Sequence, residues 1–296
     1  MYGPMTTPPI RTFSIVAIDR TTGEIGVAVA SKFLAVGAVV PWAQAGVGGV
    51  ATQARANLSY GPAGLGLLAE GHAADEVVRR LTDADEGREH RQVGIVDAQG
   101  RAAAWTGREC LAWAGHSTGD AFTCQGNILS GPAVVEAMAA IFTQGAGPLP
   151  ERLLVALAAG QEAGGDSRGQ QSAALLVVKE KGSYGGYLDR YVDLRVDDDP
   201  APILKLRALL DLHRLYFVSG EPVLMALTPE LTREVQQILQ RRGFYTGPAS
   251  GRYDEATRDA FRRFCSVENF EERWREDNLV DQAIISYIRR RLGAGW

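Results

Sequence analysis

The stretch of residues 11–33, RTFSIVAIDRTTGEIGVAVASKF, constrains the fold of this chain more than any other stretch. Apolar residues dominate Phe13–Ile18 and again Ile25–Val29, and a short polar segment with a glycine separates the two runs. Alternation of side chains with period two on both sides of a short turn is typical of a β-hairpin. The first strand begins at Thr12, directly after the Pro-rich and non-periodic residues 1–11, which we interpret as a leader.

Strands and helices follow one another in blocks up to about Phe217. Apolar periodicity predicts, in order, two short buried strands within 33–54, helices from Tyr60 and over 73–81, a hairpin over 90–107, strands near Trp113 and over 121–129, helices over 132–144 and 149–163, and strands over 171–179 and 187–196. Strand runs at both ends with helices between them indicate a layered α+β domain. Because this segment is too long for one sheet with one helix layer, two packed sheets with helices outside fit it better.

The sequence changes character between Phe217 and Met225, where we place a boundary. Thr228-Pro229-Glu230 is a strong helix start, because threonine is a favoured N-cap and proline fits the first helical position. A second helix is predicted from Asp254 and a third over 281–292. The predicted organisation is a leader at 1–11, a sheet-containing domain at 12–217, a linker at 218–227 and a small all-α domain at 228–296.

The composition argues against several classes of partner. The 296 residues carry a net charge of −4, which gives no case for binding nucleic acid or an anionic membrane surface. No apolar run is long enough to span a membrane, and the N-terminus lacks the pattern of an export signal. The three cysteines form no CxxC pair, so a reducing compartment is the simpler interpretation. We therefore expect a cytoplasmic protein.

Motifs for metals and nucleotides are absent from the sequence. There is no HExxH, no His/Cys cluster and no carboxylate triplet at ligand spacing, so we expect no metal. No glycine pattern matches a dinucleotide-binding or phosphate-binding loop, so we expect no cofactor.

Thr12 has a particular chemical potential because it opens an apolar strand. A threonine hydroxyl is a poor nucleophile near neutral pH and needs a base. The α-amine of a chain end has a pKa of about 7.7–8.0, so an N-terminal threonine carries both nucleophile and base. Cleavage of the Arg11–Thr12 bond would create that residue here. The alternative is an ordinary threonine at the start of a strand, and the pattern alone does not decide between them.

Five motifs carry a resemblance to a known family. They are, in order, TFSIVAIDRTTGEIGVAVASKF, AGVGGVATQARANLSYGPAGLGLL, REHRQVGIVDAQGRAAAWTG, CQGNILSGPAVVEAM and GGDSRGQQSAALLVVKE. Residues 11–217 thereby resemble the family called domain of unknown function ten twenty-eight, of the Ntn-hydrolase class. The resemblance implies a four-layer αββα sandwich and an amide or peptide-type hydrolase with Thr12 as nucleophile and Ser14 as the fallback. Family members often begin at Met-Thr-Phe-Ser, so the residues that precede Thr12 here would have to be removed.

Four further residues are candidates for the catalytic site. Lys32 stands in an otherwise uncharged stretch, where its positive charge could lower the pKa of a neighbouring amine. Asn127 follows Gly126, which allows close backbone approach, and its amide could hold an oxyanion. The resemblance to proteasome-like enzymes implies that Asp166 and Ser172, from the loop GGDSRGQQS, flank the nucleophile. A strand-end lysine and a solvated turn are the structural alternatives.

Polar residues near strand ends are candidates for substrate binding: Gln53, Asn57, His90, Arg168 and Ser172. Gln53 and Asn57 share one alternation, and their amides suit a substrate amide or an oxyanion. His90 precedes a strand and suits a proton shuttle. Arg168 and Ser172 belong to the polar loop around Asp166. Edge polarity, capping and turn formation are the competing explanations.

The C-terminal segment VQQILQRRGFYTGPASGRYDEATRDAFRRF, residues 235–264, resembles peptidoglycan-binding domains. The resemblance rests on Gly243, Phe244, Tyr245, Gly247, Gly251, Tyr253, Thr257, Ala260 and Phe264. It implies a peptidoglycan fragment or soluble glycopeptide as partner, or docking on the first domain. The competing explanation is that the aromatic residues form only the core of a three-helix module.

Three functional hypotheses stay open. The first is an Ntn-type amidohydrolase that cleaves an amide or peptide-like bond of a small molecule or muropeptide. The second is a non-catalytic binding protein of the same fold that recognises a cell-wall fragment or a protein partner. The third is a structural homo-oligomer, because sandwich folds of this kind often assemble. Substitution of Thr12 separates the first two, because only the enzyme would lose hydrolysis.

Overall fold

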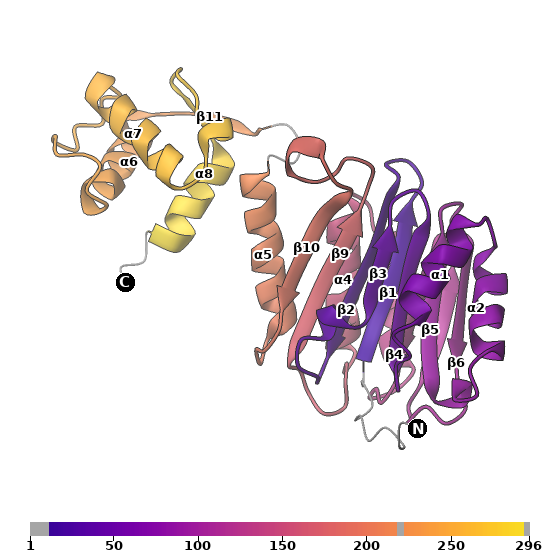
Figure 1. Cartoon of the computed structure of the whole chain (residues 1–296). Helices are drawn as coiled ribbons and strands as arrows, with labels where there is room; N and C mark the ends of the chain where they lie inside the picture. Colours follow the sequence, from indigo (N-terminus) through magenta and orange to yellow (C-terminus); the bar gives the residue numbers. More distant parts are fainter. Residues whose placement is uncertain (1–11, 218–221, 293–296) are drawn as a thin grey trace, which may run out of the picture. The chain divides into compact units, whose positions relative to one another are not determined.

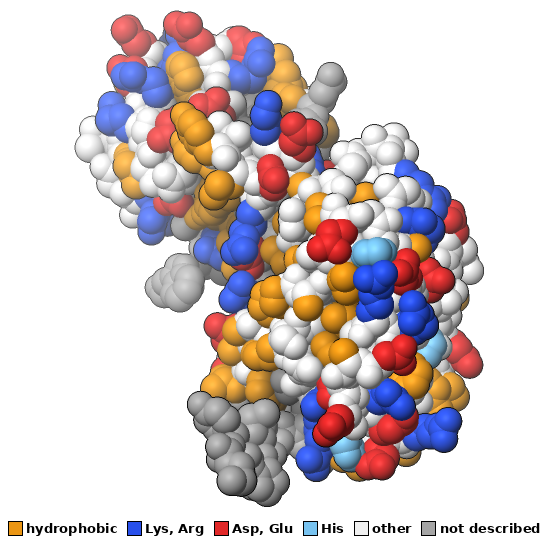
Figure 2. Space-filling model, turned by 45° about the vertical axis from the view of Figure 1, so that its right-hand side comes forward, with side chains coloured by type: hydrophobic (Ala, Val, Ile, Leu, Met, Phe, Trp, Pro, Cys, Tyr) orange, Lys and Arg blue, Asp and Glu red, His pale blue; other side chains and the backbone are white. Residues whose placement is uncertain are grey.

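Two compact units make up the protein (Figure 1). The structure, a computed structural model, describes residues 12–217 and 222–292; the predicted leader at 1–11 and residues 218–221 of the predicted linker lie outside the described residues. No helix among the described residues is long and apolar enough to cross a membrane. Acidic and basic side chains are interspersed over the visible face of each unit in Figure 2, as the small net charge suggests.

The division between the units falls between Leu210 and Asp211, whereas the sequence analysis places the end of the first domain at Phe217. Both residues of the division belong to helix α5 (Pro202–Tyr216), which has no counterpart among the predicted elements. Apolar residues lie on both faces of α5, since Leu206 is buried and Leu204 is 71% exposed. An apolar stripe at helical spacing is therefore hard to recognise in this segment.

A six-stranded antiparallel sheet lies in the first unit (Figure 1). Its strands, in spatial order, are β10 (Arg190–Val196), β9 (Ser172–Val178), β2 (Glu24–Ser31), β1 (Thr12–Asp19), β8 (Phe122–Gly126) and β7 (Gly115–Gly119). β1 and β2 form the predicted hairpin, with Thr12 opposite Ser31. On its other side β1 pairs with β8, with Phe13 opposite Gly126. Thr12 therefore lies at the end of a central strand.

A four-stranded antiparallel sheet completes the strands of the first unit. Its order is β3 (Pro41–Gln44), β4 (Gly48–Ala54), β5 (Arg91–Asp97) and β6 (Ala102–Thr106). β5 and β6 form the second predicted hairpin. The prediction of two buried strands within 33–54 is correct for β4 but wrong for β3, whose side chains are half-buried or exposed. β3 is an edge strand, so it lacks a neighbour on one side.

Four helices of the first unit were expected from periodicity, and the structure confirms them. They are α1 (Tyr60–Ala69), α2 (Ala74–Asp83), α3 (Ala133–Gln144) and α4 (Leu149–Glu162). Single 3₁₀ turns occur at Val36–Ala38, Arg88–His90 and Tyr184–Gly186. α3 and α4 contact the six-stranded sheet, and α1 and α2 contact the four-stranded sheet.

Three apolar cores join these helices and sheets. Phe13 of β1 and Leu153 of α4 belong to the core between the six-stranded sheet and its helices. Val77 of α2 belongs to the core between the four-stranded sheet and its helices. Val16 of β1 and Val96 of β5 belong to a core between the two sheets. Each fully buried side chain of this size contributes about 1.5–3 kcal/mol to stability.

The second unit is mainly helical, as predicted. Its helices are α6 (Pro229–Arg241), α7 (Glu255–Val267) and α8 (Gln282–Tyr287), which continues as a π-helical turn over Ile288–Leu292, and a 3₁₀ turn covers Glu271–Arg273. The Thr228 hydroxyl accepts a hydrogen bond from the backbone N–H of Leu231 at 3.3 Å. The Asp254 carboxylate accepts one from the backbone N–H of Thr257 at 2.9 Å. Both predicted helix starts are therefore confirmed as capped N-termini.

The prediction of an all-α second domain needs one correction. β11 (Leu224–Ala226) and β12 (Leu279–Asp281) form a two-stranded antiparallel sheet within this unit. Each strand has only three residues, and three residues are too few to display a period of two. The two segments are also far apart in the sequence, so no turn signal connects them.

Candidate active site

Thr12 lies at the start of β1 and is fully buried. Its hydroxyl Oγ1 donates a hydrogen bond to the Ser31 Oγ on β2, at 3.1 Å. Its carbonyl oxygen accepts hydrogen bonds from the backbone N–H of Asn127 at 3.0 Å and from the Gln53 Nε2 at 3.3 Å. Ser31 and Asn127 belong to or directly follow strands of the six-stranded sheet, and Gln53 belongs to β4. Both sheets therefore hold Thr12.

Five uncharged side chains lie between the sheets next to Thr12, and we call them the amide cluster: Ser14, Gln53, Gln92, Gln125 and Asn127. None is more than 1% exposed. The Ser14 hydroxyl donates to the Gln53 Oε1 at 2.6 Å and accepts from the Gln125 Nε2 at 2.7 Å. Buried polar groups are stable only when they are hydrogen-bonded, and this cluster satisfies that condition by joining one sheet to the other.

Gln92 on β5 makes the largest number of contacts in the amide cluster. Its Oε1 accepts hydrogen bonds from the Gln53 Nε2 at 2.8 Å and the Asn127 Nδ2 at 3.1 Å. Its Nε2 donates to the Gly126 carbonyl at 2.8 Å and to the Thr106 Oγ1 at 2.9 Å. Gln92 therefore fixes the orientation of two side chains that the sequence analysis selects as candidates, Gln53 and Asn127.

Ser31, Gln92 and Gln125 are missing from the residues predicted from the sequence. Gln92 and Gln125 each stand in a short strand of mostly apolar or small residues, at a position where the side chain is buried. A glutamine at such a position must find a buried partner. The position of each glutamine in its strand could be recognised in the sequence, whereas the identity of its hydrogen-bond partners could not.

A second group of polar contacts, centred on Asp166, lies beside the amide cluster. Its carboxylate is 3% exposed and accepts a hydrogen bond from the backbone N–H of Lys32 at 3.0 Å. The Arg168 guanidinium donates to both oxygens of the same carboxylate, at 3.0 and 2.7 Å. Lys32 follows Ser31 directly, so Asp166 and Arg168 hold the end of β2 on which the partner of Thr12 stands.

Lys32 and Ser172 also act on the segment after β2. The Lys32 side chain is exposed, and its Nζ donates to the carbonyl of Gln170 at 3.1 Å. The Ser172 hydroxyl is buried, donates to the carbonyl of Phe33 and accepts from the backbone N–H of Val36 at 3.1 Å. Both residues therefore shape the loop that leaves the candidate site.

Asn57 and His90 belong to a third group. The Asn57 Nδ2 donates to the Asp85 carboxylate at 3.1 Å, and the His90 Nε2 lies 3.0 Å from the Glu109 carboxylate. Burial would raise the pKa of Asp85, but hydrogen bonds, the strongest from Arg91, outweigh it and lower that pKa to about 2. This group fastens the loop after β4 to the beginning of β5. It contains none of the contacts of Thr12 described above.

The chemistry available at Thr12 is that of neutral donors and acceptors. Hydroxyls and amides hold and orient charge, but they do not take up a proton near neutral pH. Among residues 12–217 and 222–292, no group of three or more His, Cys, Asp or Glu side chains is arranged to hold a metal ion.

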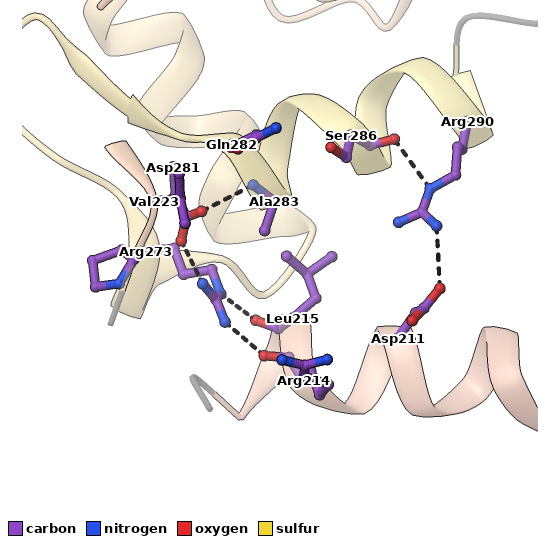
Figure 3. A pocket seen from close by; sticks show the side chains of 11 residues that line it. Asp211, Arg214, Leu215, Val223, Arg273, Asp281, Gln282, Ala283, Ser286 and Arg290 are labelled. Atoms are coloured by element: carbon purple, nitrogen blue, oxygen red, sulfur yellow. Dashed lines mark hydrogen bonds and ion pairs between the residues drawn. The ribbon is translucent and has the colours of Figure 1, made fainter. Parts of the chain in front are cut away.

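A pocket of about 340 Å³ lies in the second unit (Figure 3). Arg273 lies against it and donates to the carbonyls of Arg214 and Leu215, at 2.6 and 2.5 Å, and to the Asp281 carboxylate. Arg290 and Asp211 form an ion pair of 3.2 Å at the other end of Figure 3. The pocket thus has a polar lining with both signs of charge.

Two family models match the chain. The model described as "Family of unknown function (DUF1028)" matches residues 12–206, and the model described as "Putative peptidoglycan binding domain" matches residues 216–288. No curated protein matches the chain. A crystal structure of a DUF1028 protein from Silicibacter pomeroyi is 34% identical, with a TM-score of 0.64, and the alignment covers 71% of this chain and 88% of that one.

Two weaker similarities are to solved structures of Anbu (ancestral beta-subunit). The protein from Yersinia bercovieri is 12% identical with a TM-score of 0.31, and that from Hyphomicrobium sp. strain MC1 is 15% identical with a TM-score of 0.30. Each alignment covers 72% of this chain and 99% of the other. Similarities at this level carry no argument about the present chain.

Proposed function

The chain belongs to the family of unknown function DUF1028, and we propose that it is an N-terminal-nucleophile amidohydrolase in which Thr12 attacks an amide or peptide-like bond. The observation that carries this proposal is the place of Thr12. Its hydroxyl is buried at the end of a central strand, within hydrogen-bond distance of Ser31 and next to a cluster of neutral donors. Apart from this cluster and Thr123, the buried side chains of β1, β4, β5 and β8 between the sheets are almost all apolar or small.

We propose further that the first unit is a four-layer αββα sandwich of the Ntn-hydrolase class. The three cores support this arrangement, because one lies between the two sheets and one lies on the helix side of each sheet. An Ntn-type site needs the first strand in the middle of a sheet, so that its terminal residue has neighbours on both sides. Ser31 and Asn127 supply those neighbours for Thr12.

The proposed reaction begins with attack of the Thr12 Oγ1 on the carbonyl carbon of the substrate. The hydroxyl proton passes to the free α-amine, and the amine then gives it to the leaving nitrogen as the C–N bond breaks. A water molecule, activated by the same amine, hydrolyses the resulting ester and restores Thr12. The Asn127 Nδ2 uses one N–H for Gln92 and has a second N–H with which to hold the oxyanion.

The remaining predicted site residues have supporting parts in this proposal. Gln53 positions the Thr12 carbonyl, and Asp166 with Arg168 fixes the backbone of Lys32 next to Ser31. Lys32 and Ser172 shape the loop after β2. Substrate contacts by Asn57 and His90 stay predictions, as do a cytoplasmic location and assembly into a homo-oligomer.

The intact mass and N-terminal sequence of the purified protein test the proposal first. We expect a chain that begins at Thr12 and hydrolyses members of a panel of acyl amides. Thr12→Ala should abolish hydrolysis, Thr12→Ser should retain part of it, and Ser14→Ala tests the fallback nucleophile. A chain that keeps residues 1–11 and hydrolyses equally well after Thr12→Ala would overturn the proposal.

A second function, recognition of a cell-wall fragment, is supported by the match of residues 216–288 to a peptidoglycan-binding family. The pocket of the second unit suits a small polar ligand, since Arg290, Asp211 and Ser286 line it. Calorimetric titration of the full chain with a muramyl peptide tests this function. Binding that weakens in Arg290→Gln but not in Arg262→Gln, an exposed control, would support it. Equal binding by both variants, or none by the unchanged chain, would contradict it.

A further inference from the structure

A second pocket lies in the first unit, where the connection between β6 and β7 bends around the edges of both sheets. It encloses about 550 Å³, which is enough for a small organic molecule. Thr106 stands at the end of β6, and His116 stands on β7, the edge strand of the six-stranded sheet. Trp113 and Arg108 come from the connection itself. We call this hollow the edge pocket.

The charges at the edge pocket are of one sign. Among its described lining residues, Arg108 and His116 are the basic groups, and no aspartate or glutamate is present. The described contacts of Arg108 involve its backbone N–H, which donates to the Glu89 carboxylate at 3.1 Å. The guanidinium of Arg108 is thus available to a ligand, and a guanidinium pairs best with a carboxylate, through two parallel hydrogen bonds.

The hydrogen bonds of Thr106 bear on which ring nitrogen of His116 carries the proton. The Gln92 Nε2 can only donate, and it donates to the Thr106 Oγ1 at 2.9 Å. The Thr106 hydroxyl must then point its own proton elsewhere, and the His116 Nδ1 lies 2.9 Å away. When the Thr106 hydroxyl donates its proton to Nδ1, a neutral imidazole carries its own proton on Nε2, and we take this tautomer for the proposed site. Partial desolvation lowers the pKa of His116, which favours the neutral ring at pH 7.

From these contacts we infer that the edge pocket binds a small carboxylate that carries an aromatic or acyl group. Arg108 pairs with the carboxylate, the Nε2–H of His116 donates a hydrogen bond, and the indole of Trp113 provides an apolar wall. The site is distinct from the catalytic proposal for Thr12. The amide cluster reaches its lining through Gln92, which donates to the Thr106 Oγ1 and to the Gly115 carbonyl, so binding is expected whether or not Thr12 is a nucleophile.

Calorimetric titration of full-length Thr12→Ala protein with hippurate tests the site without turnover. We expect a Kd near or below about 1 mM, and at least tenfold weaker binding of hippuramide, which lacks the carboxylate. Arg108→Gln should weaken hippurate binding at least tenfold, and His116→Ala several-fold. The matched controls, Arg79→Gln on α2 and His72→Ala in the segment before it, should leave the Kd unchanged.

The outcomes are decisive in both directions. The site does not exist as proposed if hippurate fails to bind, if hippuramide or inorganic phosphate binds equally well, or if Arg108→Gln binds as tightly as the parent. The tautomer is tested separately by ¹⁵N NMR of the histidine rings. A protonated Nε2 and a bare Nδ1 in His116 at pH 7 are expected, and the opposite tautomer would remove His116 as the donor.

Discussion

The largest buried polar group of each unit differs in charge. In the first unit the amide cluster around Thr12 consists of neutral groups, and its hydrogen bonds join one sheet to the other. In the second unit the central buried pair is charged, since Arg273 and Asp281 have side chains only 7% and 3% exposed. Neutral amides are less costly to bury than charges, and they do not change their protonation with pH. The first arrangement therefore suits a reaction site, and the second suits a structural anchor.

The largest effect is expected for the charged anchor. Arg273→Ala leaves the Asp281 carboxylate buried without its cation and removes two donors from the end of α5. Breaking a buried ion pair in this way costs about 3–5 kcal/mol. Urea unfolding of the full chain, followed by hydrogen exchange of the amides of α6 to α8, measures the loss.

The control for this change is Arg275→Ala, which breaks the ion pair with Asp277 at the surface. Exposed pairs of this kind contribute about 0.2–1 kcal/mol. Equal losses in the two variants would show that burial does not distinguish Arg273, and the contrast between the units would then fail.

The next largest effect is expected in the amide cluster. Gln92→Leu removes the acceptor of Gln53 and Asn127 and the donor of the Gly126 carbonyl. Each buried group left without a partner costs about 1–3 kcal/mol, so a total loss of about 2–4 kcal/mol is expected after partial rearrangement. Urea unfolding monitored by tryptophan fluorescence measures it. Gln99→Leu, in the turn of the same hairpin and exposed, should change stability by less than about 0.5 kcal/mol.

A smaller loss of stability is expected at Gly94, where the absence of a Cβ leaves space for a side chain of the amide cluster. A Cβ added at Gly94 on β5 would lie 2.1 Å from the Gln125 Oε1, so Gly94→Ala must displace that side chain. Overpacking of this kind costs about 1–3 kcal/mol. Gly66 in α1 has open space around an added Cβ, so Gly66→Ala should instead stabilise by about 0.5–1 kcal/mol. Thermal unfolding of both variants measures the two changes in Tm. Shifts of the same sign in the two variants would contradict this expectation.

The smallest effect concerns the Cys110 thiol, which is half-buried and contacts the carbonyl of Arg91. Burial raises the pKa of the Cys110 thiol to about 11, so the thiolate appears only as the pH rises towards that value. Since the thiolate is the reactive form, alkylation at pH 7.5 should be more than about one hundredfold slower than for a free cysteine of pKa about 8.5. Mass-spectrometric labelling of the native chain measures the rate. Rapid alkylation of Cys110 at that pH would contradict the effect of burial.

The parts of the fold that depend on local sequence could be predicted. The hairpin of β1 and β2 follows from alternation on both sides of one turn, and the starts of α6 and α7 follow from Thr228 and Asp254 as N-caps. The two-stranded sheet of β11 and β12 could not be predicted, because its strands are short and two helices separate them in the sequence. α5 was hidden because its apolar residues do not keep to one face.

In the candidate site, too, residues recognisable from local sequence could be predicted, and residues that depend on distant partners could not. Thr12 could be selected because its own chemistry is unusual at the start of a strand, and Gln53 and Asn127 because their amides interrupt apolar segments. Gln92 matters only through its partners, and these come from β4, β6, β7 and β8 and from the residue after β8. Lys32 illustrates the opposite case, since the structure places its backbone, rather than its charge, next to Asp166.

The pairing of β1 determines how long after Thr12 the ribosome makes the residues that surround it. Ser14 and Gln125 are separated by 111 positions, and the Lys32 backbone and Asp166 by 134. A ribosome that adds about 5–20 residues per second therefore makes the last of these partners roughly 10–30 s after Thr12. Until then the nascent chain holds an ordinary threonine on an unfinished sheet. Synthesis itself thus delays the proposed chemistry until the first unit has folded.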